Sequence, residues 1–149
     1  MKLSALYQIF LDCQSVTTDS RNCPDGSLFI ALKGESFNGN AFAKLALDSG
    51  CAFAIIDEIQ YAVEGDQRYI LVDDCLQTMQ QLANYHRRQL GTRVIGITGT
   101  NGKTTTKELI SSVLCQAHNV LYTLGNLNNH IGVPTTLLRL KPEHDLAVI

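Results

Sequence analysis

The stretch with the clearest chemistry is Thr98-Gly-Thr-Asn-Gly-Lys-Thr104, which joins an apolar segment to a segment with helical spacing. Glycines at such a junction let successive backbone N–H groups turn toward one anion, and the helix that follows adds the positive end of its dipole. Lys103 can bring an ammonium to the β- and γ-phosphates, and the Thr104 hydroxyl can ligate Mg²⁺. The stretch therefore predicts a site for the phosphates of a nucleotide.

This stretch departs at one position from the general phosphate-loop consensus. The consensus has a glycine five residues before Gly102, where this chain has Ile97. A plain glycine turn between a strand and a helix is the structural alternative. An exposed lysine adds nothing to such a turn, whereas Gly-Lys-Thr at a strand–helix junction is what phosphate binding requires. We therefore expect nucleotide binding here.

The segments around this loop predict a sheet with helices. Apolar strands are expected at 93–98, which we predict to be buried, at 119–122 and at 145–149. A short helix is expected from Pro134, which suits a first turn, through Leu140. The helix predicted over 103–117 has its apolar positions at Leu109, Ile110, Val113, Leu114 and Ala117.

The first part of the chain alternates between segments with strand-like patterns and segments with helix-like patterns. Strands are predicted at 27–32, 51–57 and 67–73, and helices at 41–49 and 76–90, with a short amphipathic helix at the amino terminus. Strands separated by helices indicate a parallel or mixed sheet. We place a domain boundary after Gly91-Thr92, which gives an α/β fold: a small N-terminal α/β domain (1–92), then the first part of a phosphate-loop, parallel-sheet domain (93–149).

Composition limits the class of protein. The chain has 149 residues, 45% of them hydrophobic and 17% charged, with a net charge of −2, which excludes disorder and disfavours a nucleic-acid partner. No apolar run approaches the roughly 20 residues that span a bilayer, so no membrane insertion is expected. The five cysteines are scattered, without metal-ligand spacing, which predicts reduced thiols, a cytoplasmic location and no structural metal.

Several stretches resemble one family. Thr98–Thr104 is similar to the phosphate loop of the Mur ligases, which lack the first consensus glycine. The segment Gly125-Asn-Leu-Asn-Asn-His-Ile-Gly-Val-Pro134 resembles the branch of that family that joins D-alanyl-D-alanine to UDP-N-acetylmuramoyl-tripeptide. The amino-terminal part carries four further similar stretches: Thr18-Asp-Ser-Arg21, Pro24-Asp-Gly26, Leu28-Phe-Ile-Ala-Leu-Lys-Gly34 and Phe37-Asn-Gly-Asn-Ala-Phe42.

The resemblance implies an ATP-dependent ligase of peptidoglycan precursor synthesis with three domains, for the UDP-linked substrate, ATP and the incoming amine. ATP phosphorylates the terminal carboxylate of the tripeptide, and the amine of D-alanyl-D-alanine then displaces phosphate from the acyl phosphate. Lys103 is the implied catalytic residue and Thr104 the implied Mg²⁺ ligand. The implied ATP-binding residues are Gly99, Thr100, Asn101, Gly102, Lys103, Thr104 and Thr105.

The resemblance also implies substrate-binding residues, which are Ser20, Arg21, Lys33, Gly34, Asn38, Gly39, Asn126, Asn128 and Asn129. The first six are candidates for uracil, ribose or pyrophosphate contacts, and the planar fork of Arg21 suits a diphosphate. Local turn chemistry is the alternative for the asparagines, and an exposed turn is the alternative for Ser20 and Arg21. Asn38-Gly39-Asn40 replaces the Asp-Gly-His type of loop that family members often carry, so no catalytic role is assigned there.

Other functions stay open at this point. A Mur-type ligase for a different amino acid and a folylpolyglutamate synthetase are disfavoured only by the resemblance of 126–134. A generic phosphate-loop kinase or ATPase and a non-catalytic binding module are alternatives from other classes. Because the chain stops in a predicted strand at Ile149, we expect a fragment that does not catalyse ligation alone, and we expect the protein to be a monomer.

Overall fold

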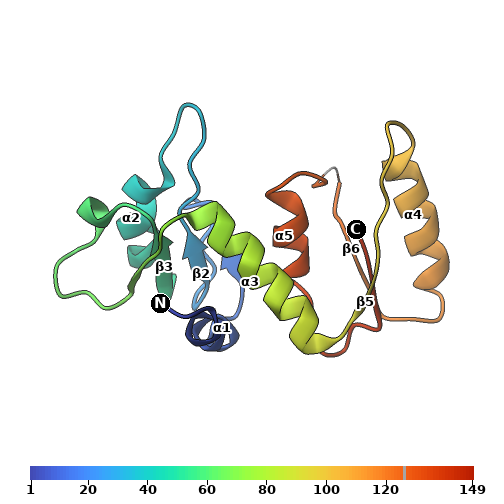
Figure 1. The fold of residues 1–149 in the computed structure, drawn as a ribbon, viewed down its shortest axis with the longest axis horizontal. Coiled ribbons are helices and arrows are strands. Elements are labelled where there is room, and N and C mark those ends of the chain that lie inside the picture. Colours follow the sequence, from blue (N-terminus) through green and yellow to red (C-terminus); the bar gives the residue numbers. More distant parts are fainter. Residues whose placement is uncertain (126) are drawn as a thin grey trace. The chain divides into compact units, whose positions relative to one another are not determined.

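The computed structural model describes residues 1–125 and 127–149, so Asn126 lies outside the described residues. The chain forms two compact units, residues 1–82 and 83–149. Figure 1 labels the elements of both. The helix α3 (Cys75–Leu90) begins in the first unit and ends in the second. The sequence-based boundary after residue 92 stays a prediction.

The first unit is built on a four-stranded parallel sheet in the order β1-β2-β3-β4. Every side chain of β2 is buried, as are three of the four side chains of β3, which is typical of parallel strands covered on both faces. The strands are β1 (Val16–Thr17), β2 (Leu28–Ile30), β3 (Phe53–Ile56) and β4 (Tyr69–Leu71).

Helices surround this sheet. The helix α1 (Leu3–Asp12) buries Leu6, Tyr7 and Phe10, and α2 (Ala43–Asp48) packs on β3 (Figure 1). Short 3₁₀ turns are formed by Gly39–Phe42 (η1) and Ile59–Tyr61 (η2). The helix α2, predicted over 41–49, ends before Gly50, whose left-handed φ of 119° is typical of the residue that follows a helix.

The second unit has a three-stranded parallel sheet in the order β5-β7-β6. The strand β7 (Leu146–Val148) lies between β5 (Arg93–Ile95) and β6 (Val120–Tyr122) and is buried throughout. Helices α4 (Lys103–Leu114) and α5 (Gly132–Leu137) connect the strands. An α/β fold with parallel sheets, as predicted, is therefore confirmed.

Alternation along β6 and β7 divides the core of the second unit between two faces. Val120, Leu146 and Val148 pack with α4 residues Ile110 and Leu114. On the other face, three buried residues pack with Leu90 at the end of α3 and Leu137 of α5: Leu121, Leu140 and Ala147. Figure 1 shows α4 and α5 on opposite sides of these strands.

Three sequence-based expectations need correction. β5 is exposed along its length, not buried, because among the described residues no helix packs closely on it, whereas α4 packs on β6 and β7. On α4, Leu109 and Val113 are 64% and 71% exposed, although both were predicted as apolar helix positions. The two-residue strand β1 was not predicted, since its single pairing with β2 leaves too short a pattern to detect.

Among the described residues, no helix is both long and apolar enough to cross a bilayer. All five cysteines are free thiols. His86, on the second half of α3, is buried, and its Nε2 lies 2.9 Å from the carbonyl oxygen of Leu140. Burial lowers the pKa of His86, and the contact with this carbonyl offsets that effect only in part.

Candidate functional site

The phosphate-loop residues lie where β5 ends and α4 begins. Gly99 and Gly102 have φ values of 146° and 77°, a backbone region that side-chain-bearing residues rarely adopt. Gly102 is the N-cap of α4 and makes no side-chain cap hydrogen bond. The first-turn N–H groups of α4 have no carbonyl partner within the helix, so this end of a twelve-residue helix fits an anion.

Lys103 and Thr104 occupy the first turn of α4. The Lys103 side chain bends back over the loop, and its Nζ donates to the carbonyl oxygen of Gly99. Thr100, Asn101, Gly102, Thr104 and Thr105 are exposed. Thr104 lies in the turn that fits the anion, and threonine hydroxyls ligate Mg²⁺ in phosphate loops, so the residues present suit a nucleotide phosphate with Mg²⁺.

A small hollow lies beside this turn, at the carboxyl edge of the second sheet. Its lining residues come from the ends of all three strands and from α4: Ile97, Lys103, Thr104, Lys107, Thr123, Gly125, Asn128 and Ile149. In open α/β sheets, ligands bind outside the carboxyl ends of parallel strands. The predicted phosphate loop and Asn128 therefore share one hollow with the exits of β6 and β7.

Lys107 is a residue of this hollow that sequence reasoning missed. It is 5% exposed, and its Nζ donates to the carbonyl oxygens of Thr123 and, at 2.9 Å, Gly125. Its ammonium also lies 3.0 Å from Oε1 of Glu108. Apolar periodicity could not find it, because Lys107 and Ser111 interrupt the helical stripe 107, 110, 111 and 114 with polar side chains, although this stripe is the buried one.

The asparagines of the 126–129 segment have different surroundings. Asn128 lines the hollow. Asn129 accepts the N–H groups of Ile131 and Gly132 through Oδ1, at 3.1 and 2.7 Å, which is local capping at the start of α5. The prediction for Asn126 falls outside the described residues.

In the first unit, Ser20 and Arg21 form the turn after β1. The guanidinium of Arg21 donates two hydrogen bonds to the carboxylate of Asp19, with Nε and Nη2 each 2.9 Å from a carboxylate oxygen. These bonds hold the pKa of Asp19 at about 2. The guanidinium that suits a diphosphate is thus paired with the carboxylate of Asp19 at the surface.

The other first-unit candidates lie in the loop after β2. Because β1 and β2 are parallel neighbours, this loop and the turn that follows β1 both lie at the carboxyl edge of the sheet. Lys33 pairs across the loop with Asn38 in an isolated bridge, and Gly34 donates to the carbonyl of Phe37 at 3.0 Å. A Cβ on Gly39 would lie 2.4 Å from the carbonyl oxygen of Leu32. The loop therefore packs closely against the end of β2.

Two polar residues of this edge were missed by sequence reasoning. Asn40, which is 1% exposed, donates through Nδ2 to Oδ1 of Asp57 at 2.8 Å. Asp57 directly follows β3 and also lies 3.1 Å from Nζ of Lys33. A single acid after a strand is too common a pattern to detect, so only the structure connects it with the loop.

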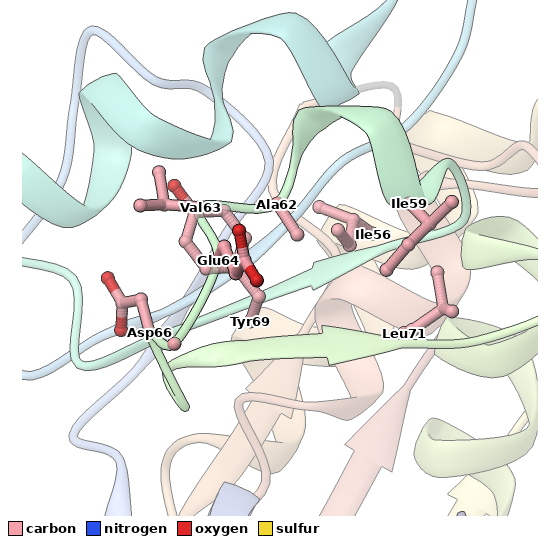
Figure 2. Close-up of a pocket in the computed structure, with 9 residues that line it drawn as sticks. Ile56, Ile59, Ala62, Val63, Glu64, Asp66, Tyr69 and Leu71 are labelled. Carbon is pink, nitrogen blue, oxygen red and sulfur yellow. The ribbon is translucent and has the colours of Figure 1, made fainter.

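Figure 2 shows a separate cavity, of about 380 Å³, in the first unit. Apolar side chains of Ile56, Ile59 and Leu71 lie at one end, and the carboxylates of Glu64 and Asp66 lie at the other. None of the described residues that line it carries a positive charge. This cavity therefore does not suit a nucleotide diphosphate.

Comparison with protein families gives two consecutive matches. Residues 12–87 match the family model described as "Mur ligase family, catalytic domain", and residues 97–149 match the one described as "Mur ligase middle domain". Together these matches cover both units of the structure.

Curated relatives carry one name. The UDP-N-acetylmuramoyl-tripeptide–D-alanyl-D-alanine ligases of Bacillus subtilis and Escherichia coli are 46% and 44% identical to this chain over 134 and 135 residues. These alignments cover 90% and 91% of this chain. The chain spans about 29% of the length of both relatives.

Solved structures agree with these matches. A crystal structure of MurF from Acinetobacter baumannii aligns with a TM-score of 0.85 and 35% identity, covering 99% of this chain and 35% of that one. A MurF ligase from Thermotoga maritima in complex with ADP aligns with a TM-score of 0.80 and 29% identity, covering 93% of this chain and 32% of that one.

Proposed function

The chain belongs to the Mur ligase family, and on that basis we propose that it is the amino-terminal part of a ligase that adds D-alanyl-D-alanine to UDP-N-acetylmuramoyl-tripeptide in peptidoglycan precursor synthesis. Residues 1–92 form the substrate domain in this proposal, and 93–149 begin the ATP-binding domain. The observation that carries it is the phosphate loop, which borders one hollow with the exits of β6 and β7. A cytoplasmic location and a monomeric state stay predictions.

The proposed reaction has two steps. The terminal carboxylate of the tripeptide takes the γ-phosphoryl group of ATP, which gives ADP and an acyl phosphate. The amine of D-alanyl-D-alanine then attacks the acyl carbon, an amide bond forms, phosphate leaves and the amine loses a proton. Activation is needed because a carboxylate has no good leaving group, whereas an acyl phosphate has one.

The roles of the second-unit residues follow from where charge develops. The loop from Gly99 to Thr105 binds the phosphates through backbone N–H groups, and the ammonium of Lys103 stabilises the negative charge that accumulates during phosphoryl transfer. Thr104 is the proposed ligand of Mg²⁺, which supplies further positive charge when bound. Asn128, which lines the same hollow, contacts nucleotide or substrate in this proposal, and Asn126 and Asn129 belong to the same proposed segment.

The first unit supplies the proposed site for the UDP-linked substrate. Its residues follow two neighbouring parallel strands, the edge where ligands bind in such sheets: Ser20, Arg21, Lys33, Gly34, Asn38 and Gly39. For Arg21 to hold the diphosphate, its guanidinium must exchange Asp19 for phosphate oxygens. This exchange is feasible because both side chains are exposed, by 86% and 46%, so their ion pair contributes little.

The proposal is tested on the full-length protein by following ADP release. We expect release only when UDP-N-acetylmuramoyl-tripeptide and D-alanyl-D-alanine are both present, with L-alanyl-L-alanine as the matched control amine. Calorimetry should give tighter binding for the UDP-linked tripeptide than for UDP. ADP release without the UDP-linked substrate would point to a phosphate-loop ATPase or kinase. Release with a single amino acid, or with a folate and glutamate, would point to another ligase.

A further inference from the structure

One buried carboxylate organises the candidate substrate loop of the first unit. The side chain of Asp57 is only 4% exposed, and its Oδ1 accepts from Nδ2 of Asn40 at 2.8 Å and lies 3.1 Å from Nζ of Lys33. Its Oδ2 accepts the backbone N–H of Cys75, the first residue of α3, at 3.2 Å. Asp57 thus joins the loop after β2, the end of β3 and the start of α3.

Asn40 makes this connection reciprocal. Its Oδ1 accepts the backbone N–H of Asp57 at 3.0 Å, while its Nδ2 donates to the carboxylate of the same residue. Nδ2 and the backbone N–H of Asn40 also donate to Oδ1 of Asn38, at 2.8 and 3.0 Å. The buried amide is therefore satisfied on both of its sides by groups whose positions it fixes.

Glu58 provides a second connection between the same segments. Its Oε1 and Oε2 accept from Nδ2 of Asn38 at 3.1 and 3.2 Å, and Oε1 lies 3.4 Å from Nζ of Lys33. Its Oε2 also accepts from Nε2 of Gln60 at 2.8 Å. Both ends of the loop 33–40 are therefore held by carboxylates that follow β3.

The electrostatics favour this arrangement when Asp57 is ionised. A buried carboxylate is costly unless charged or polar partners surround it. Burial tends to raise the pKa of Asp57, but the hydrogen bonds from Asn40, from the Cys75 amide and from Lys33 outweigh it and lower the pKa overall. Removing this negative charge would weaken three contacts at once, two of them to the loop.

We propose that Asp57 and Glu58 are positioning residues for the UDP-linked substrate, because they hold Lys33 and Asn38 in the conformation that meets it. This inference rests on the proposed function, which assigns the loop 33–40 to that substrate. The carboxylate oxygens of both residues are engaged by the loop and its neighbours, so they act through Lys33 and Asn38 without touching the substrate.

The test is steady-state kinetics of the full-length protein carrying Asp57→Asn. We expect the KM for the UDP-linked tripeptide to rise about tenfold, the factor that the loss of one hydrogen bond to a charged group corresponds to. The KM for ATP and the kcat should stay unchanged, since the phosphate loop lies in the other unit. The matched control is Asp66→Asn, which removes a carboxylate paired with Arg68 and should leave all three constants unchanged.

Other outcomes overturn the inference in distinguishable ways. A lower thermal midpoint with an unchanged KM would mean that Asp57 only stabilises the fold. An equal rise in the KM for ATP would show that Asp57 does not act specifically on the UDP-linked substrate. A wild-type protein without activity on the UDP-linked tripeptide would refute the proposed function itself, and the inference with it.

A second variant covers the case in which Asp57→Asn does not fold. Glu58→Gln changes a side chain that is 25% exposed, keeps its shape, removes its charge and replaces one acceptor oxygen by an amide donor. We expect a rise of about threefold in the KM for the UDP-linked tripeptide, because Glu58 is less buried and its bonds are weaker in solvent. An unchanged KM in this folded variant would overturn the proposal.

Discussion

The two candidate sites lie at the carboxyl edges of two parallel sheets, but their loops are organised in opposite ways. The first-unit loop, 33–40, is held by side chains, with Asn40 and Asp57 buried. The phosphate loop of the second unit is exposed along 98–102 and takes its shape from backbone dihedrals at Gly99 and Gly102. One loop is locked by internal partners, whereas the other presents backbone donors to an anion.

The two loops also need their glycines, Gly39 and Gly102, for different reasons. Gly39 is needed because a Cβ would collide with the carbonyl oxygen of Leu32, although its φ is not left-handed. A Cβ on Gly102 would meet no atom within 4 Å, but this residue has a left-handed φ of 77°. Close packing requires glycine at 39, whereas backbone conformation requires glycine at 102. Substitutions at the two positions should therefore lower the free energy of unfolding by different amounts.

The largest effect is expected from Lys103→Ala in the full-length protein. Removing a positive group from the transferred phosphate should lower kcat by about 10²–10³-fold, the usual loss for one preorganised stabilising group. Affinity for the UDP-linked substrate, measured by calorimetry, should not change, because the proposed site for that substrate lies in the other unit. Lys141→Ala removes an exposed lysine of the same unit and is the matched control. Unchanged kcat in Lys103→Ala would contradict the assignment of the loop.

The second prediction compares Gly39→Ala with Gly102→Ala. We expect Gly39→Ala to lower the free energy of unfolding by about 3 kcal/mol, since the backbone of Ala31 and Leu32, directly after β2, cannot move away easily. Gly102→Ala should cost only about 1 kcal/mol, the strain of a left-handed alanine. Urea unfolding of the two variants measures both values. Equal losses, or a larger loss for Gly102→Ala, would show that the two loops are not organised differently.

The sequence predicted the positions of helices and strands better than the solvent exposure of their side chains. The strand over 145–149 and the helix over 76–90 were predicted from apolar patterns, and both are confirmed. β5 has an equally apolar pattern but is exposed, because an apolar pattern alone does not show whether a helix covers the strand. The position of the phosphate loop between a strand and a helix is confirmed, while its role stays a prediction.

Polar residues inside the structure could not be predicted in the same way. Lys107 and Ser111 occupy the buried stripe of α4, whereas Leu109 and Val113 face outward. Hydrophobic periodicity assumes that buried positions are apolar, so it selects the wrong face when a lysine is buried with carbonyl partners. Asp57 was missed for a related reason, since its partners come from segments far away in the sequence.

A smaller effect than that of Gly39→Ala is expected from Lys107→Met, which tests whether side chains also organise the second edge. Methionine keeps the length and apolar stem of the lysine but leaves the carbonyls of Thr123 and Gly125 without this donor. We expect the free energy of unfolding to fall by about 1–2 kcal/mol, with Lys141→Met as the exposed control, both measured in urea. A loss as large as that of Gly39→Ala would mean that the second edge depends on its internal partners as strongly as the first. A loss near zero would instead leave the backbone of the phosphate loop as its main organiser, because the β6 exit would then hold its conformation without the Lys107 ammonium.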